Sequence, residues 1–116
     1  MVFRIVLLAG LMSGAVVTAA AEQAAPAPDG AAIFGRSCAM CHGPDGRAAT
    51  PVAKRMGVRD LASADLTDER VRAAVLDGIK APKGAMPAFR GRLSEAELDA
   101  LVAHVRSLRP TENAAK

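Results

Sequence analysis

The chain has 116 residues and a formal net charge of +3, from 15 basic and 12 acidic side chains. Charges this evenly balanced argue against nucleic-acid binding, for which basic residues should dominate one face of the protein. Three phenylalanines and no tryptophan or tyrosine leave few large side chains for a core. Because domains of this size often depend on a disulfide, a metal or a cofactor, we expect a non-protein group at the centre.

Residues 1–21 have the pattern of a secretory signal peptide. Arg4 precedes an apolar run over residues 5–17, and the alanines at 19–21 fit the small-residue cleavage pattern. The apolar run is shorter than the roughly 20 residues that a membrane-spanning helix needs, although a retained anchor is the alternative interpretation. We expect export to the periplasm, cleavage after about Ala21, and no stable membrane insertion afterwards.

The rest of the chain divides into three parts. Residues 22–29 are rich in alanine and proline and lack periodicity, which predicts a flexible tether. Residues 30–110 are expected to form one domain, followed by a disordered tail at 111–116. The domain begins with a predicted helix over residues 30–37, for which Asp29 is the N-cap. Gly30 and Phe34 share one face of this helix, so another helix can approach closely there.

The predicted first helix leads into the sequence Ser-Cys-Ala-Met-Cys-His-Gly at residues 37–43. Cys-x-x-Cys-His is the sequence at which haem is attached in c-type cytochromes. In that chemistry Cys38 and Cys41 each add to one vinyl group of the porphyrin, while His42 reaches the iron. The spacing between the cysteines allows the tight turn that these three bonds require.

Three other interpretations of this motif remain open. An exported protein can form a simple disulfide between Cys38 and Cys41. A thioredoxin-like redox pair would need strands on both sides of the motif, and the sequence contains no clear strand pattern. A zinc site would need four ligands from a chain that has two cysteines and two histidines.

Residues 43–65 contain many helix breakers and predict a long irregular segment, which is typical of a chain that wraps a cofactor. A second helix is expected over residues 68–77, with Thr67 as its N-cap and Gly78 as its end. The third helix begins with a capping box at residues 94–97 and continues to Leu108. Its apolar positions form one stripe, namely Leu98, Leu101, Val102, Val105 and Leu108.

An electron carrier needs a second axial ligand to the haem iron, and a methionine at that position raises the reduction potential. Met86 lies in an expected irregular loop at residues 83–89, where glycine and proline hold the chain so that it can present a thioether. Met56 is expected to pack beneath the haem instead. Ligation by Met56 or His104, or an open iron site, are the alternatives.

Together these motifs resemble the class I c-type cytochromes, specifically the small bacterial proteins with one haem, over about residues 30–108. The resemblance implies an all-α fold in which three to five helices wrap around one covalently attached haem c. It implies that the N-terminal and C-terminal helices cross, with Gly30 and Phe34 against Leu101. It also implies thioether bonds from Cys38 and Cys41.

The resemblance assigns the iron ligands as well: His42 is the proximal ligand and Met86 the distal one. The family commonly uses a proline carbonyl to accept the proton of the ligand histidine, and Pro51 is the candidate here. The chain departs from the family at His104, where an aromatic residue is usual. We expect His104 to pack against the helix that carries Phe34 or to face water, the alternative being a pH-responsive contact near the haem.

The function implied is that of a soluble one-electron carrier between redox proteins, with no catalytic residue and no small-molecule substrate. A basic rim would favour a partner with an acidic docking surface. Two alternatives remain: a haem enzyme or sensor with an open iron site, and the haem subunit of a larger dehydrogenase or oxidase complex. The residues expected in the basic rim are Arg36, Lys54, Arg55, Lys80, Lys83, Arg90 and Arg92.

Overall fold

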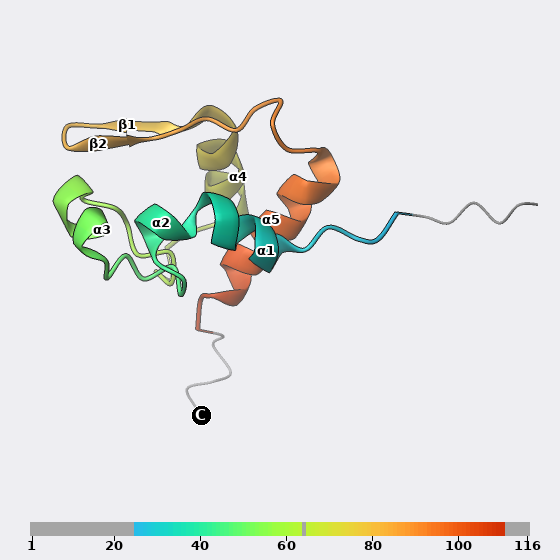
Figure 1. Cartoon of the computed structure of the whole chain (residues 1–116), viewed down its shortest axis with the longest axis horizontal. Helices are drawn as coiled ribbons and strands as arrows, with labels where there is room; N and C mark the ends of the chain where they lie inside the picture. The colour runs from blue at the N-terminus through green and yellow to red at the C-terminus, as the bar shows by residue number, and fades with distance from the viewer. Residues whose placement is uncertain (1–24, 64, 111–116) are drawn as a thin grey trace, which may run out of the picture.

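A computed structural model of the chain describes residues 25–63 and 65–110 (Figure 1). The predicted signal peptide, the first residues of the predicted tether and the predicted tail lie outside these ranges. Residues 25–29 are extended and exposed. The elements that follow in the described residues are α1 (Gly30–Ser37), α2 (Ala39–His42), α3 (Pro51–Met56), α4 (Asp68–Asp77), β1 (Ile79–Ala81), β2 (Gly84–Met86) and α5 (Glu95–Ser107).

Helix α1 packs across α5 at its first residue. Asp29 caps α1 by accepting hydrogen bonds from the backbone N–H groups of Ala31 and Ala32. A Cβ atom added to Gly30 would lie 2.0 Å from the carbonyl oxygen of Ala100, so only glycine fits at this crossing. One turn later, the ring centroid of Phe34 is 5.1 Å from that of His104. Leu101, the expected partner, lies in the same buried cluster as Phe34, and the structure adds Ala100 and His104 at the crossing.

Helices α4 and α5 complete the core with α1. Thr67 caps α4, and Ser94 and Glu97 form the predicted capping box of α5. None of the residues of the main buried cluster lies in α2, α3 or the hairpin, so the core occupies only part of the domain. The cluster consists of Ile33, Phe34, Leu66, Val71, Val75, Phe89, Leu98, Leu101, Val102 and Val105.

Residues 79–86 form an antiparallel hairpin, where the sequence analysis expected a helical protein with an irregular loop. Ile79 pairs with Met86 and Ala81 pairs with Gly84, around a two-residue turn at Pro82 and Lys83. Strands of three residues are too short to show alternation in the sequence, which is why the pattern did not predict them. The described chain is mostly helical, as predicted, and this hairpin is its departure from an all-α fold.

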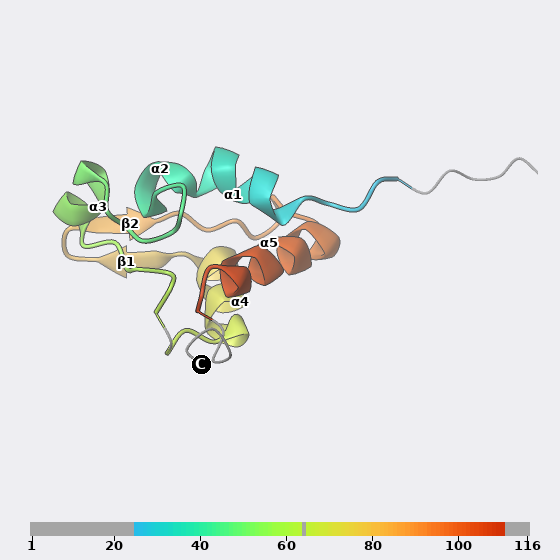
Figure 2. The ribbon, with the colours of Figure 1, turned by 90° about the horizontal axis from the view of Figure 1, so that it is seen from below.

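Two segments project from the core at the end of the molecule opposite to residues 25–29 (Figures 1 and 2). We call residues 38–57, which contain α2 and α3, the His42 arm. We call residues 79–86, which form the β1–β2 hairpin, the Met86 arm. Within the described residues, every helix falls short of the length and apolar character needed to cross a membrane.

Candidate functional site

The cysteine motif lies at the junction of α1 and α2, where the chain makes one tight turn. Cys38 ends α1, and its carbonyl accepts hydrogen bonds from the backbone N–H groups of Cys41 at 3.1 Å and His42 at 3.0 Å. Both thiols are half-buried and neither is in a disulfide. Burial raises the pKa of the Cys38 thiol, and the neighbouring Cys41 raises it further. The turn therefore brings two thiols and an imidazole to one short stretch of backbone.

The described residues support none of the three competing interpretations of this motif. Cys38 and Cys41 are free thiols rather than a disulfide. The strands lie at residues 79–86 and do not flank the motif, as a thioredoxin-like site would require. Within residues 25–63 and 65–110, no group of three or more histidine, cysteine or acidic side chains is placed to hold a metal ion.

His42 lies in an environment that favours its neutral form. Burial lowers the pKa of His42, while a hydrogen bond that the imidazole donates to the backbone carbonyl of Arg59 opposes that shift. Its Nδ1 atom is buried and has no hydrogen-bond partner of good geometry in the described structure. A neutral imidazole is the form that binds a metal ion, so His42 has the protonation state that an iron ligand needs.

Nδ1 of His42 makes no hydrogen bond to the carbonyl of Pro51 in the described residues, and the role of Pro51 beside His42 stays a prediction. Pro51 is an exposed residue in the first turn of α3, where its fixed φ suits a helix start, and Thr50 caps the same helix. The backbone group that acts on His42 belongs to Arg59, which the sequence analysis missed. Residues 59–61 return to the motif because the N–H of Leu61 donates to the carbonyl of Gly46 at 2.8 Å, a long-range contact that leaves no local sequence signal.

Met86 is the last residue of β2 and is half-buried against the core. Gly78, between α4 and β1, holds the neighbouring chain in place. It has a φ of +70°, and a Cβ atom added there would lie 2.6 Å from the carbonyl oxygen of Met86. Only glycine allows both the positive φ and the close approach of the Met86 carbonyl, so Gly78 fixes the position of the hairpin base, including Met86, relative to α4.

The other two possible ligands have different surroundings. Met56 ends α3 and packs on Gly84 of the Met86 arm. His104 lies in α5 with its ring beside Phe34, which confirms its expected packing against that helix. Among the three, Met86 is the residue at the base of the hairpin, where the chain leaves β2 through Pro87.

The residues of the two arms fit an apolar ring with a metal at its centre. A thiol pair, a neutral imidazole and a thioether are soft and intermediate donors of the kind that haem attachment and iron ligation use. The large hydrophobic side chains that stay exposed among the described residues are Met40, at 80%, and Ile79, at 50%. Both belong to the arms, and Ile79 shares a hairpin face with Met86 because paired residues point the same way. A bound porphyrin would cover apolar surface of this kind.

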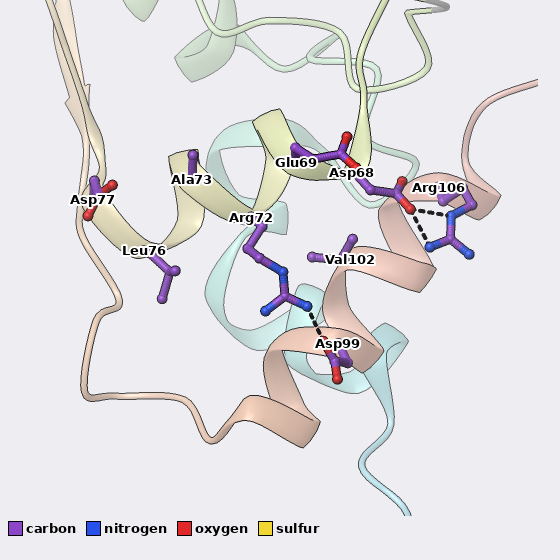
Figure 3. Close-up of a pocket in the computed structure, with 9 residues that line it drawn as sticks. All are labelled: Asp68, Glu69, Arg72, Ala73, Leu76, Asp77, Asp99, Val102 and Arg106. Carbon is purple, nitrogen blue, oxygen red and sulfur yellow. Dashed lines mark hydrogen bonds and ion pairs between the residues drawn. The ribbon is translucent and has the colours of Figure 1, made fainter.

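A groove between α4 and α5 does not share these properties (Figure 3). Its lining contains no cysteine, histidine or methionine. Its charged side chains bind one another: Arg72 pairs with Asp99, and Arg106 pairs with Asp68. The cysteines, His42 and Met86, which are the candidate haem-binding residues, therefore all lie in the two arms.

Comparison with known proteins gives the family. The model of the family described as cytochrome c oxidase, cbb3-type, subunit III, matches residues 25–105. The chain is a class I c-type cytochrome of this family. It is 39% identical over 77 residues to cytochrome c6 of Microcystis aeruginosa, covering 66% of the chain and 90% of that cytochrome. The solved structure of KustC0563 c-type cytochrome matches with a TM-score of 0.60 and 30% identity, over 71% of the chain and 99% of that structure.

The cytochrome is also similar to larger proteins. It is 38% identical over 80 residues to the cbb3-type cytochrome c oxidase subunit FixPc of Rhizobium leguminosarum bv. viciae, covering 68% of the chain and 26% of that subunit. The CcoP subunit of Cereibacter sphaeroides is 33% identical over 93 residues, with 75% and 29% covered. The chain thus spans about a quarter of the length of these two subunits.

Membership of this family confirms the cofactor predicted from the cysteine motif. A c-type cytochrome carries covalently bound haem c with iron, and the cysteines at 38 and 41 match that attachment. The general function is electron transport.

Proposed function

We propose that this cytochrome is an exported, soluble carrier of single electrons in which His42 and Met86 are the axial ligands of one haem iron. It exchanges electrons with other redox proteins, binds no small-molecule substrate and is not an enzyme. The domain spans residues 30–110, between a signal peptide at 1–21 with a tether at 22–29 and a tail at 111–116. The predicted signal supports a periplasmic location.

One observation carries the assignment of the ligands. The Met86 arm presents Gly84 and Met86 on the same face, and the end of the His42 arm packs against that face through Met56. The His42 arm therefore contacts the same face of the hairpin from which the Met86 side chain projects. Two ligands on facing segments suit the two sides of one planar group.

Each residue then has a defined part in the proposed function. Haem supplies the one-electron iron couple when it is bound. Cys38 and Cys41 hold the group covalently, and His42 donates its neutral imidazole. Met86 raises the reduction potential and fills the coordination position that oxygen would otherwise use.

The charges of the arms support a partner with an acidic docking surface. Lys54, Arg55, Lys80 and Lys83 are exposed and take part in none of the ion pairs of the described residues. Residues 46–59 and 78–94 contain no acidic side chain. Arg90, which the sequence analysis placed in this rim, pairs with Asp77 instead, and Arg92 lies over the Phe89 ring at 4.8 Å. The proposed docking surface therefore loses Arg90 and Arg92 from the predicted rim, keeps the exposed Arg36 of α1, and is centred on the arms.

The similarity to FixPc and CcoP favours a second candidate function, the haem-carrying part of a larger oxidase complex. Gentle purification from membranes of the native host separates the two. A free carrier elutes alone, whereas an oxidase component elutes with its complex.

The test of ligation is the absorption spectrum of the oxidised and reduced protein made in a host that attaches haem. We expect the weak red band of methionine-bound ferric haem in the wild type. This band disappears in Met86→Ala and persists in Met56→Leu. A high-spin ferric spectrum and ready carbon monoxide binding by the wild type would instead favour the open iron site.

A further inference from the structure

The His42 arm and the Met86 arm touch where Met56 meets Gly84. Met56 is the half-buried last residue of α3, and Gly84 is the first residue of β2. A Cβ atom added to Gly84 would lie 2.6 Å from Cε of Met56 and 3.3 Å from its Cβ and Cγ. The whole Met56 side chain therefore lies along the Gly84 backbone, in space that any other residue at position 84 would occupy.

Gly84 is required for this close approach and not for backbone conformation. It is absent from the glycines with positive φ, which include Gly78 and Gly57. An alanine at position 84 meets no backbone strain, only the Met56 side chain. The flexible, unbranched side chain of Met56 thus fills the space that is free because Gly84 has no side chain.

The contact lies on the same face of the hairpin as Met86. Successive side chains of a strand alternate between faces, so the Cβ direction at Gly84 and the side chain of Met86 point the same way. Met56 consequently presses on the face that carries the proposed iron ligand, two residues before it.

Packing, and no polar bond, joins the two arms. No hydrogen bond or ion pair of the described residues connects residues 38–57 with residues 79–86. No residue of the main buried cluster lies in either arm, although Cys38, Ala39 and Met86 are partly buried against it. The Met86 arm is therefore anchored to the core at Gly78 and Met86, and the Met56 contact restrains its free end.

We propose that Met56 is a positioning residue: by packing on Gly84 it holds the Met86 arm against the His42 arm and so limits how often Met86 is replaced by an external ligand. This inference rests on the proposed His42 and Met86 ligation. It assigns Met56 a role in regulating access to the site, beyond the ordinary packing that the sequence suggested.

The test is titration of the ferric holoprotein with imidazole, a ligand that binds only when Met86 has left. Apparent affinity for such a ligand rises with the population of the open state. We expect Met56→Ala and Gly84→Ala each to bind imidazole about tenfold more tightly than the wild type, because either change breaks the contact. Met56→Leu, which keeps most of the volume, should stay close to the wild type.

Two control variants separate this effect from general loss of packing. Leu93→Ala removes a half-buried side chain outside both arms, and Gly35→Ala adds a methyl group where no atom lies within 4 Å. Both should bind imidazole as the wild type does. The double variant Met56→Ala/Gly84→Ala should bind less tightly than the product of the single effects predicts, because the new methyl group fills the vacated space.

Each remaining outcome has a definite meaning. Imidazole affinity in Met56→Ala equal to that of Leu93→Ala would overturn the positioning role, as would a Met56→Leu variant that behaves like Met56→Ala. If Met86→Ala binds imidazole no better than the wild type, the proposed ligation by Met86 is wrong. This result is distinct from one that contradicts only the positioning role of Met56. If Met56→Ala does not fold, the imidazole affinity of Gly84→Ala is compared with that of Leu93→Ala instead, and equal values would overturn the positioning role.

Discussion

At the scale of single residues, Gly30 and Gly78 each allow a close backbone contact, and the sequence predicted only the first of these contacts. The prediction that Gly30 lets another helix approach is confirmed, because the Ala100 carbonyl lies where a Cβ atom would be. Gly78 was expected only to end a helix, and the structure adds its contact with the Met86 carbonyl. The first role follows from a local pattern of glycine and aromatic residues, whereas the second depends on residues that meet only after folding.

Gly30→Ala should destabilise the protein. The added methyl group would overlap the Ala100 carbonyl, a backbone group that cannot move aside without shifting α5. Overpacking of this kind costs about 1 to 3 kcal/mol, measured as the change in unfolding free energy in denaturant. Gly35→Ala is the matched control and should be neutral or stabilising, because alanine is the better helix former. Equal denaturation midpoints for Gly30→Ala and the wild type would contradict the crossing.

Asp65 gives a pH-dependent contribution to stability. Hydrogen bonds from Ser63 and then from Arg59 lower the pKa of Asp65 to about 2. Because the folded-state pKa is lowered, the stabilisation is present above the ordinary carboxyl pKa and is lost as the pH falls through about 2. Asp65→Asn should therefore melt at a lower temperature than the wild type at neutral pH, and the difference should shrink in strong acid.

The control for this prediction is Glu69→Gln, which removes the charge of an exposed acidic residue that takes part in none of the ion pairs of the described residues. It should change the melting temperature little at any pH. A difference between Asp65→Asn and the wild type that grows towards low pH would have the wrong sign.

At the scale of elements, helices with local signals were predictable and the hairpin was not. The capping box and apolar stripe of α5 are encoded within one stretch of sequence, and the structure contains both. The Met86 arm has strands of three residues, and its shape depends on Gly78 and on the contact of Gly84 with Met56. Contacts between distant segments leave no periodic pattern, so the sequence indicated only an irregular loop there.

Ser94→Ala should weaken α5. The Ser94 side chain accepts a hydrogen bond from the Glu97 N–H at 3.1 Å, and the Glu97 side chain accepts one from the Ser94 N–H at 2.8 Å. Loss of an N-cap of this type costs about 1 kcal/mol in unfolding free energy. Ser94→Asn, which can still cap, should restore most of it. Denaturant unfolding measures both, and an alanine variant as stable as the wild type would contradict the capping role.

At the scale of the whole molecule, charges and core are distributed unequally. The ion pairs of the described residues lie on α4, α5 and the segments beside them, for example between Asp68 and both Arg106 and Arg109. These arginines help to lower the pKa of Asp68, Arg106 most strongly. Helix α3 and the Met86 arm instead carry exposed cations, within residues 46–59 and 78–94, which contain no acidic side chain. The motif residues of the site were predictable because Cys38, Cys41 and His42 lie within five residues of one another. The separation of the ion pairs from the exposed cations of the arms became visible only in the folded structure.

Reversing the charge of the arms should slow reaction with an anionic redox reagent. In Lys80→Glu/Lys83→Glu, oxidation of the reduced protein by hexacyanoferrate(III) should be about tenfold slower at low ionic strength. The difference should fade as salt is added, because screening removes long-range attraction. Arg70→Glu, an exposed change on α4, should have a smaller effect. Equal rates for the wild type and the double variant would contradict docking at the arms.

The most direct test of His42 and Met86 ligation is the NMR spectrum of the reduced holoprotein labelled with ¹³C at the methionine methyl groups. A methyl group bound directly above a haem is shifted strongly upfield by the ring current of the porphyrin. Ligation by Met86 predicts one such resonance, absent from Met86→Leu and retained in Met56→Leu. A wild-type spectrum with no strongly shifted methyl resonance, or one lost in Met56→Leu instead, would contradict it.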